Sequence, residues 1–160
     1  MVNMSQNSSE AVQLPLNKEL VLKVIPMPAD ANGNGDIFGG WLMAQMDMGG
    51  AILAKELAHG RVVTIAVEAM TFHRPVAVGD VVCCYGECQH VGRTSLKIHL
   101  EVWVKKVSRE PIGDSYRVTE AAFTYVAVDN NGKPRALPHD KPELAAVIAR
   151  LAQSADTQVS

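Results

Sequence analysis

The sequence predicts an α+β fold in which a curled antiparallel sheet wraps around one long central helix. The first observation is an apolar run of 18 residues, 37–54, that contains a single charge, Asp47. The second is that the hydrophobic period changes from 3.6 to 2 after Gly60, and β-like runs then follow with no helix between them, which indicates antiparallel pairing. A flat sheet does not bury a helix that is apolar all round, so the sheet must curl or a second subunit must complete the burial.

Length and composition fit one globular domain with its own core. The net charge is −2, there is no basic block, and aromatic residues make up only 5%, which argues against a nucleic-acid-binding surface. The polar start, 1–13, lacks the pattern of a secretory signal, and Gln45, Asp47 and four glycines make 37–54 a core helix rather than a membrane span. Three clustered cysteines form no disulfide framework, so we expect a cytoplasmic protein.

The first third of the chain predicts a tail, a strand and the long helix. Residues 1–16, rich in Ser, Asn and Gln, are typical of a flexible tail, and 18–25 alternates as a strand does. After a turn-rich loop, Asp36 is placed to cap the helix that we expect over 39–58. His59-Gly60 then supplies a cation and a left-handed glycine cap where the helix should end.

Four strands and a second helix follow. Alternating, β-branched runs bounded by turn residues predict strands at 61–72, 81–91, 94–107 and 116–128. Asp140 and Glu143 have the spacing of a capping box before an amphipathic helix at 144–151. We therefore expect a tail (1–16), a single domain (17–137) and a C-terminal helix with its own tail (138–160).

Asp47 and the Gly39-Gly40 pair together suggest a catalytic site. A buried carboxylate is costly unless it is paired, hydrogen-bonded or used. A Gly-Gly pair at a helix start leaves backbone N–H groups open to an anion. Asp47 is seven positions after Gly40, about 10 Å of helical rise, which leaves room for a carbonyl group and a water. The structural alternative is that Asp47 only caps or bridges subunits.

Several motifs resemble the hotdog-fold acyl-CoA thioesterases, in particular the short bacterial YciA-like branch. The main motif is Asn-Gly-Asn-Gly-Asp-Ile-Phe-Gly-Gly-Trp at 32–41, followed by Gln-Met-Asp at 45–47. Supporting segments lie at 78–82, 91–95 and 127–132. The resemblance implies a hotdog fold, dimers with one continuous sheet, and assembly into hexamers as trimers of dimers. It also implies an active site at the dimer interface, where acyl-CoA is hydrolysed to free CoA and a carboxylic acid.

Thioester hydrolysis requires an activated water and a stabilised oxyanion. We assign the first to Asp47, as a general base or, alternatively, as a nucleophile that forms an anhydride, with Met43, Met46 and Met48 expected to exclude water from it. The backbone N–H groups of Gly39 or Gly40 are expected to hold the oxyanion.

The loop before the helix supplies three further candidates. In a relative, an Asn at the position of Asp36 contributes to catalysis, so Asp36 is a catalytic candidate here. Asn32 and Asn34 are candidates for positioning the thioester or the water. The alternative for all three is that Asn and Asp simply suit turns and helix caps.

CoA brings phosphates that basic residues bind. Arg74 is one candidate, and the resemblance places the nucleotide near the turn formed by Gly92, Arg93, Thr94 and Ser95. The alternative is that each of these charges is simply solvated. Trp41 and the methionines suggest an adaptable pocket with broad acyl specificity. The histidines lack metal-ligand spacing, so we expect no metal, and no cofactor beyond the CoA of the substrate itself.

Two other functions are compatible with the same motifs. A non-catalytic acyl-CoA-binding or regulatory hotdog protein would keep the glycines without needing Asp47. A hotdog dehydratase or hydratase would need a His paired with a carboxylate on the helix or loop, and no His precedes residue 59.

Overall fold

The computed structural model describes residues 14–159. In chain order the elements are β1 (Glu19–Val24), the short 3-10 helix η1 (Pro28–Asp30), α1 (Gly39–Ala58), β2 (Val62–Glu68), β3 (Val81–Val91), β4 (Ser95–Lys105), β5 (Ser115–Ala127) and α2 (Pro142–Thr157). None of the helices in this part of the chain is long and apolar enough to span a membrane.

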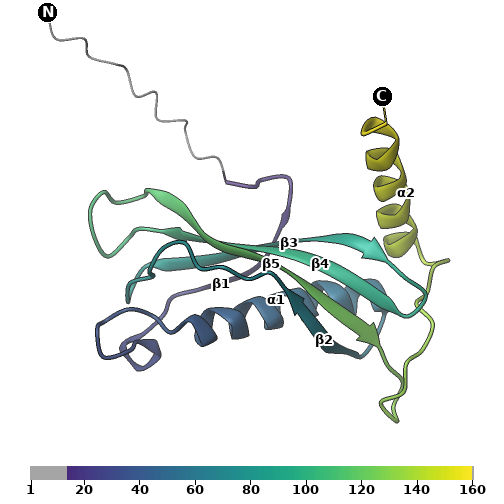
Figure 1. Cartoon of the computed structure of the whole chain (residues 1–160), viewed down its shortest axis with the longest axis horizontal. Helices are drawn as coiled ribbons and strands as arrows, with labels where there is room; N and C mark the ends of the chain where they lie inside the picture. Colours follow the sequence, from purple (N-terminus) through teal and green to yellow (C-terminus); the bar gives the residue numbers. More distant parts are fainter. Residues whose placement is uncertain (1–13, 160) are drawn as a thin grey trace, which may run out of the picture.

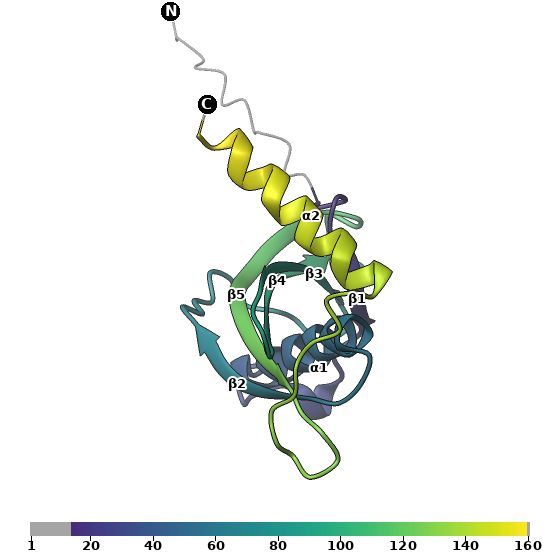
Figure 2. The same cartoon turned by 90° about the vertical axis from the view of Figure 1, so that its right-hand side faces the viewer.

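One antiparallel sheet holds all five strands, in the order β1-β3-β4-β5-β2. The sheet curls around α1, which lies against its concave face (Figures 1 and 2). The curled sheet around one long helix confirms the predicted fold class. β1 and β2 are the two edges, so each has one side without a strand partner among the described residues.

Helix α1 has the predicted bounds, but its two ends differ from the prediction. The N-cap is Phe38, which makes no side-chain cap, because Asp36 lies in a backbone bridge with Ala77. The prediction that Asp36 caps the helix is therefore wrong. At the other end His59, not Gly60, adopts the left-handed conformation with φ 51°. The His59 ring lies 3.1 Å from the Glu143 carboxylate, which holds it in place.

The lengths of the other elements follow the prediction with local departures. β3 has the predicted bounds, whereas β2 ends at Glu68 because Ala69 takes a positive φ of 48°. Helix α2 runs to Thr157, beyond the predicted end. Its N-cap is Lys141 and lacks a side-chain cap, so the predicted capping box does not form.

The main core lies between α1 and the concave face of the sheet, and contains Met46, Leu100, Phe123 and Tyr125. A smaller cluster covers the other face: Val81, Cys83, Tyr85 and Trp103, with Leu14 packed against it. The predicted tail, 1–16, lies outside the described residues apart from its last three. The proposed division of the chain at residues 17 and 138 stays a prediction.

Candidate active site

Asp47 lies half-buried in the middle of α1, and two side chains of the sheet contact it. The Thr64 hydroxyl donates to Oδ1 of Asp47 at 2.6 Å. The Tyr125 hydroxyl donates to the backbone carbonyl of Asp47 at 2.9 Å and lies 3.3 Å from the same Oδ1. Thr64 and Tyr125 are register partners on β2 and β5, so both side chains leave the same face of the sheet.

The surroundings of Asp47 are only partly apolar within one chain. Of the three methionines expected to exclude water from it, Met46 is fully buried, whereas Met43 and Met48 are exposed. Within residues 14–159, no hydrogen bond or ion pair reaches Oδ2 of Asp47. One carboxylate oxygen is therefore held and the other is available.

The start of α1 presents open backbone donors. Neither Gly39 nor Gly40 donates a hydrogen bond through its N–H within the described part of the chain. A Cβ at Gly40 would meet nothing within 4 Å, while one at Gly39 would press against the Phe72 ring. These N–H groups and the helix dipole suit an oxyanion.

The loop before α1 is braced by Asn32. Its Oδ1 accepts from the backbone N–H of Asn34 at 2.9 Å and of Asp36 at 3.2 Å. This side chain is thus used within the turn, which favours a structural role for Asn32. The Asp36 side chain has no such role and lines a cavity of about 370 Å³ together with Gly39 and Leu42.

Arg74 connects that cavity to a smaller, basic one. It lines the 370 Å³ cavity together with Asp36 and Gly39. It also lines a hollow of about 140 Å³ with Pro75, Lys106, Arg109 and Tyr116. The Arg74 guanidinium lies over the Tyr116 ring, 5.3 Å from its centroid. No acidic residue lines this hollow, so it is suited to an anion.

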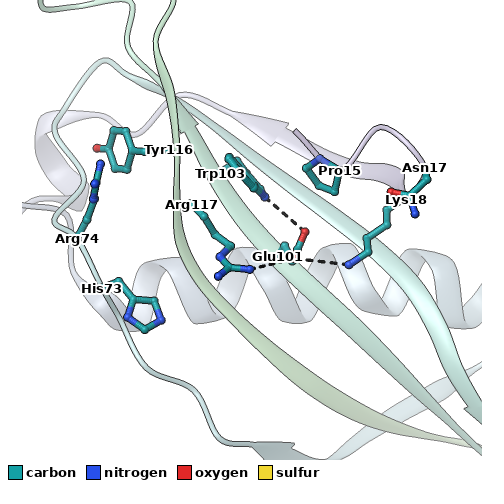
Figure 3. Close-up of a pocket in the computed structure, with 9 residues that line it drawn as sticks. All are labelled: Pro15, Asn17, Lys18, His73, Arg74, Glu101, Trp103, Tyr116 and Arg117. Carbon is teal, nitrogen blue, oxygen red and sulfur yellow. Dashed lines mark hydrogen bonds and ion pairs between the residues drawn. The ribbon is translucent and has the colours of Figure 1, made fainter. Parts of the chain in front are cut away.

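A further cavity, about 670 Å³ in volume, lies on the face of the sheet away from α1 (Figure 3). At its centre the buried Glu101 accepts from the Trp103 indole at 3.4 Å and lies 3.5 Å from both Lys18 and Arg117. These contacts satisfy the carboxylate within the protein. The cavity therefore contains none of the predicted catalytic residues.

One group of side chains in the described residues has the spacing of metal ligands. Ligand atoms of His99, Glu101 and Glu120 lie within 4.8 Å of one another. Lys18 and Arg117 already pair with this group, and their charges disfavour a further cation there.

Backbone hydrogen bonds hold the predicted nucleotide-binding turn, Gly92–Ser95, in place. Gly92 donates to the Ser95 carbonyl at 2.8 Å, and Leu137 donates to that of Arg93 at 2.9 Å. The turn stands at the start of β4, whereas Lys106 follows its end. The 11 residues of β4 span about 35 Å. One chain therefore does not bring this turn and Arg74 together.

Sequence reasoning missed Thr64 and Tyr125. They lie 17 and 78 positions after Asp47, and only the register of β2 against β5 places them side by side. The alternation in each strand identifies inward-facing positions. It does not tell which inward residue lies opposite which turn of the helix.

The sequence and the structure are both similar to known thioesterases. A model of the thioesterase superfamily matches residues 34–110. The acyl-CoA thioester hydrolase YciA of Escherichia coli strain K12 is 72% identical over 120 residues, covering 75% of this chain and 91% of the relative. An uncharacterized acyl-CoA thioester hydrolase of Haemophilus influenzae is 63% identical over 135 residues, covering 84% and 88%.

A solved structure extends this similarity to three dimensions. It is the Asp44Ala mutant of HI0827, a hexameric broad-specificity acyl-coenzyme A thioesterase. The TM-score is 0.82 at 61% identity, and the match covers 85% of this chain and 99% of the other. The chain therefore belongs to the hotdog-fold acyl-CoA thioester hydrolases.

Proposed function

We propose that this protein hydrolyses acyl-CoA thioesters to free CoA and a carboxylic acid, with Asp47 as the catalytic carboxylate. The observation that carries the proposal is the state of that side chain: Oδ1 is held by Thr64, and Oδ2 has no partner within the described residues. The related HI0827 protein was studied as an aspartate-to-alanine mutant, which supports a role for an aspartate in this family.

The reaction follows from the two halves of the site. Oδ2 of Asp47 takes a proton from a water, and the resulting hydroxide attacks the thioester carbonyl carbon. The carbonyl oxygen becomes an oxyanion that the N–H groups of Gly39 or Gly40 stabilise. The C–S bond then breaks, CoA leaves as a thiolate and takes up the proton that Asp47 had accepted, and the acid is released. Direct attack by Asp47 would instead form an anhydride that water cleaves.

A second copy of the chain completes the site in this proposal. Val63, Ile65 and Val67 are exposed on β2, and Met48 and Ile52 are exposed on α1. Pairing β2 with β2 of another copy covers these side chains and satisfies the open edge. Two antiparallel copies also bring the Gly92–Ser95 turn of one chain toward the Arg74 end of the other. Because the HI0827 thioesterase is hexameric, we propose a trimer of such dimers.

The basic hollow beside Arg74 is proposed to hold a CoA phosphate. Arg109 is fixed there by ion pairing with Asp80 at 2.9 Å, and Lys106 forms no ion pair within the described residues. Asp36, which lines one cavity with Gly39 and Arg74, and the nearby Asn34 are proposed to orient the pantetheine arm, while Asn32 shapes their loop. Arg93, Thr94 and Ser95 of the second copy are proposed to contact the nucleotide. A cytoplasmic location is proposed because all three cysteines are free.

The decisive experiment measures release of free thiol from acyl-CoAs of short to long chain length. We expect activity across the panel and its loss in Asp47→Ala, with Asp140→Asn as the exposed control. No activity on any chain length would overturn the proposed function, and an active Asp47→Ala variant would overturn the role of Asp47. Single-turnover hydrolysis in ¹⁸O water then separates the two mechanisms, because only direct attack labels the enzyme carboxylate.

The CoA-phosphate proposal has its own test, with two adjacent lysines as matched variants. Lys106→Ala should raise KM for acyl-CoA about tenfold and leave KM for acyl-pantetheine unchanged, since acyl-pantetheine lacks the phosphates. Lys105→Ala, one residue away on β4 and outside the hollow, should change neither. Equal effects of Lys106→Ala on both substrates would place the phosphates elsewhere.

A further inference from the structure

Tyr125 reaches Asp47 from the interior of the core. Its side chain is fully buried. The hydroxyl group is the polar end of the ring and points to α1. That hydroxyl lies between two acceptors of one residue, the backbone carbonyl of Asp47 at 2.9 Å and its Oδ1 at 3.3 Å. Burial, followed by the nearby Asp47 carboxylate, raises the pKa of Tyr125. The hydroxyl therefore keeps its proton and acts as a donor.

The helix leaves space for this hydroxyl. A Cβ at Gly50, three residues after Asp47, would collide with the Tyr125 hydroxyl and with Leu100. Glycine in a helix interior costs about 1 kcal/mol relative to alanine, so its presence here has a packing reason. The Tyr125 hydroxyl and the Gly50 gap form one fitted contact between β5 and the turn of α1 that carries Asp47.

We propose that Tyr125 is a positioning residue for Asp47, which it holds together with Thr64 so that Oδ2 is presented to the reacting water. This rests on the proposed function of Asp47. Thr64 fixes the side chain through Oδ1, and Tyr125 fixes the backbone and the same oxygen. The two donors come from register partners on β2 and β5. A carboxylate held on one side loses the rotation that would turn Oδ2 away from the substrate.

The two hydrogen-bond donors, Tyr125 and Thr64, differ in their exposure to solvent. Tyr125 is buried in the core, whereas Thr64 stands on the exposed edge strand. Both contacts with Asp47 lie within one copy, but Thr64 lies on the edge that is proposed to pair with a second copy, whereas Tyr125 lies in the core. Tyr125 neither contacts substrate nor transfers a proton in this proposal.

The test compares Tyr125→Phe, Thr64→Val and the double variant, with kcat and KM measured separately on one acyl-CoA. We expect kcat to fall about tenfold in Tyr125→Phe with KM within about twofold, because the ring still fills the core. Thr64→Ser, which keeps the donor, should restore most of the activity lost in Thr64→Val. Since both donors act on one carboxylate, the double variant should lose less than the product of the two single losses.

Tyr85→Phe is the matched control, because Tyr85 is buried in the cluster on the sheet face away from α1. Wild-type kcat in Tyr125→Phe, or an equal fall in Tyr85→Phe, would overturn the positioning role. So would a rise in KM without a change in kcat. Asp47→Ala is measured in parallel: if it retains activity the proposed function of Asp47 fails, whereas an inactive Asp47→Ala with a fully active Tyr125→Phe overturns only the role of Tyr125.

Discussion

The middle of α1 and the turn before β3 each contain an aspartate, Asp47 and Asp80. The two carboxylates differ in how deeply they are buried and in how many of their oxygens accept hydrogen bonds. Asp80 is 0% exposed, and both of its oxygens are used. Asp47 is half-buried and has one oxygen held by Thr64 and Tyr125. A carboxylate that is fully hydrogen-bonded stabilises structure, whereas one that is half-satisfied keeps a lone pair for chemistry.

The contacts of Asp80 explain its role. Oδ1 accepts from the backbone N–H groups of Val107 and Ser108 at 3.1 Å and from the Ser108 hydroxyl at 2.7 Å. Oδ2 pairs with Arg109 at 2.9 Å. Burial alone would raise its pKa, but the hydrogen bonds from Ser108 and Arg109 lower the pKa of Asp80 to about 2. The side chain thus ties the turn before β3 to the segment after β4.

The contrast between Asp47 and Asp80 is tested first by Asp47→Asn, for which we expect the largest effect, a loss of catalysis. The amide keeps the shape and the hydrogen bond from Thr64 but accepts no proton, so kcat should fall about a thousandfold. The free energy of unfolding, measured by urea titration, should change by no more than about 1 kcal/mol. A variant that keeps its kcat, or that unfolds far more readily, would make Asp47 a structural residue like Asp80.

Asp80→Asn should show the opposite pattern. It leaves Arg109 and two backbone N–H groups facing an uncharged amide, so the free energy of unfolding should fall by about 3 kcal/mol. The kcat of the folded protein should stay within about twofold of wild type, because the contacts of Asp80 are to residues 107–109 and not to Asp47 or the start of α1. Urea titration and kinetics on the same preparation measure both quantities. A stable Asp80→Asn protein would contradict the contrast between the two aspartates.

The pH dependence of stability is the next effect in size. The pKa of Asp80 in the folded state, about 2, lies below its ordinary value of 3.8. Its contribution is therefore complete above about pH 4 and is lost as the pH falls toward 2, a decrease of about 2 kcal/mol. Urea titrations at pH 5, 3 and 2 measure it. The slope over this range should be smaller in Asp80→Asn, and an equal slope would assign the loss to other carboxylates.

The smallest expected effect is that of Asp36→Asn, with a fall in kcat of about threefold. Asp36 is exposed at the rim of the cavity, and its backbone rather than its side chain holds the loop. Kinetics at low and high salt measure the effect, which should shrink at high salt. A loss as large as that in Asp47→Asn would make Asp36 a second catalytic carboxylate.

The sequence predicts this fold well where local pattern decides, and less well where distant contacts decide. The apolar run before Ala58 and the alternation over 81–91 were enough to place α1 and β3. The predicted helix caps were wrong because the two residues have other partners. Asp36 forms a backbone bridge with Ala77, and the Glu143 carboxylate contacts the His59 ring.

The same limit applies to the site. Asp47 is visible in the sequence because a charge interrupts an apolar pattern. Thr64 and Tyr125 are not visible, because a Thr and a Tyr are ordinary in strands and only the β2–β5 register brings them to Asp47. Asp80 sits in a turn where an Asp is also ordinary, so its burial was not predictable either.

The buried cysteines bear on how the enzyme's product is detected. Burial raises the pKa of the Cys84 thiol to about 12 and of Cys88 to about 11, and also raises that of Cys83. At neutral pH these groups stay protonated and shielded, so they react slowly with disulfide reagents. A chromogenic thiol reagent added to the folded protein therefore reports the CoA that is released, and a signal from the protein itself reports unfolding.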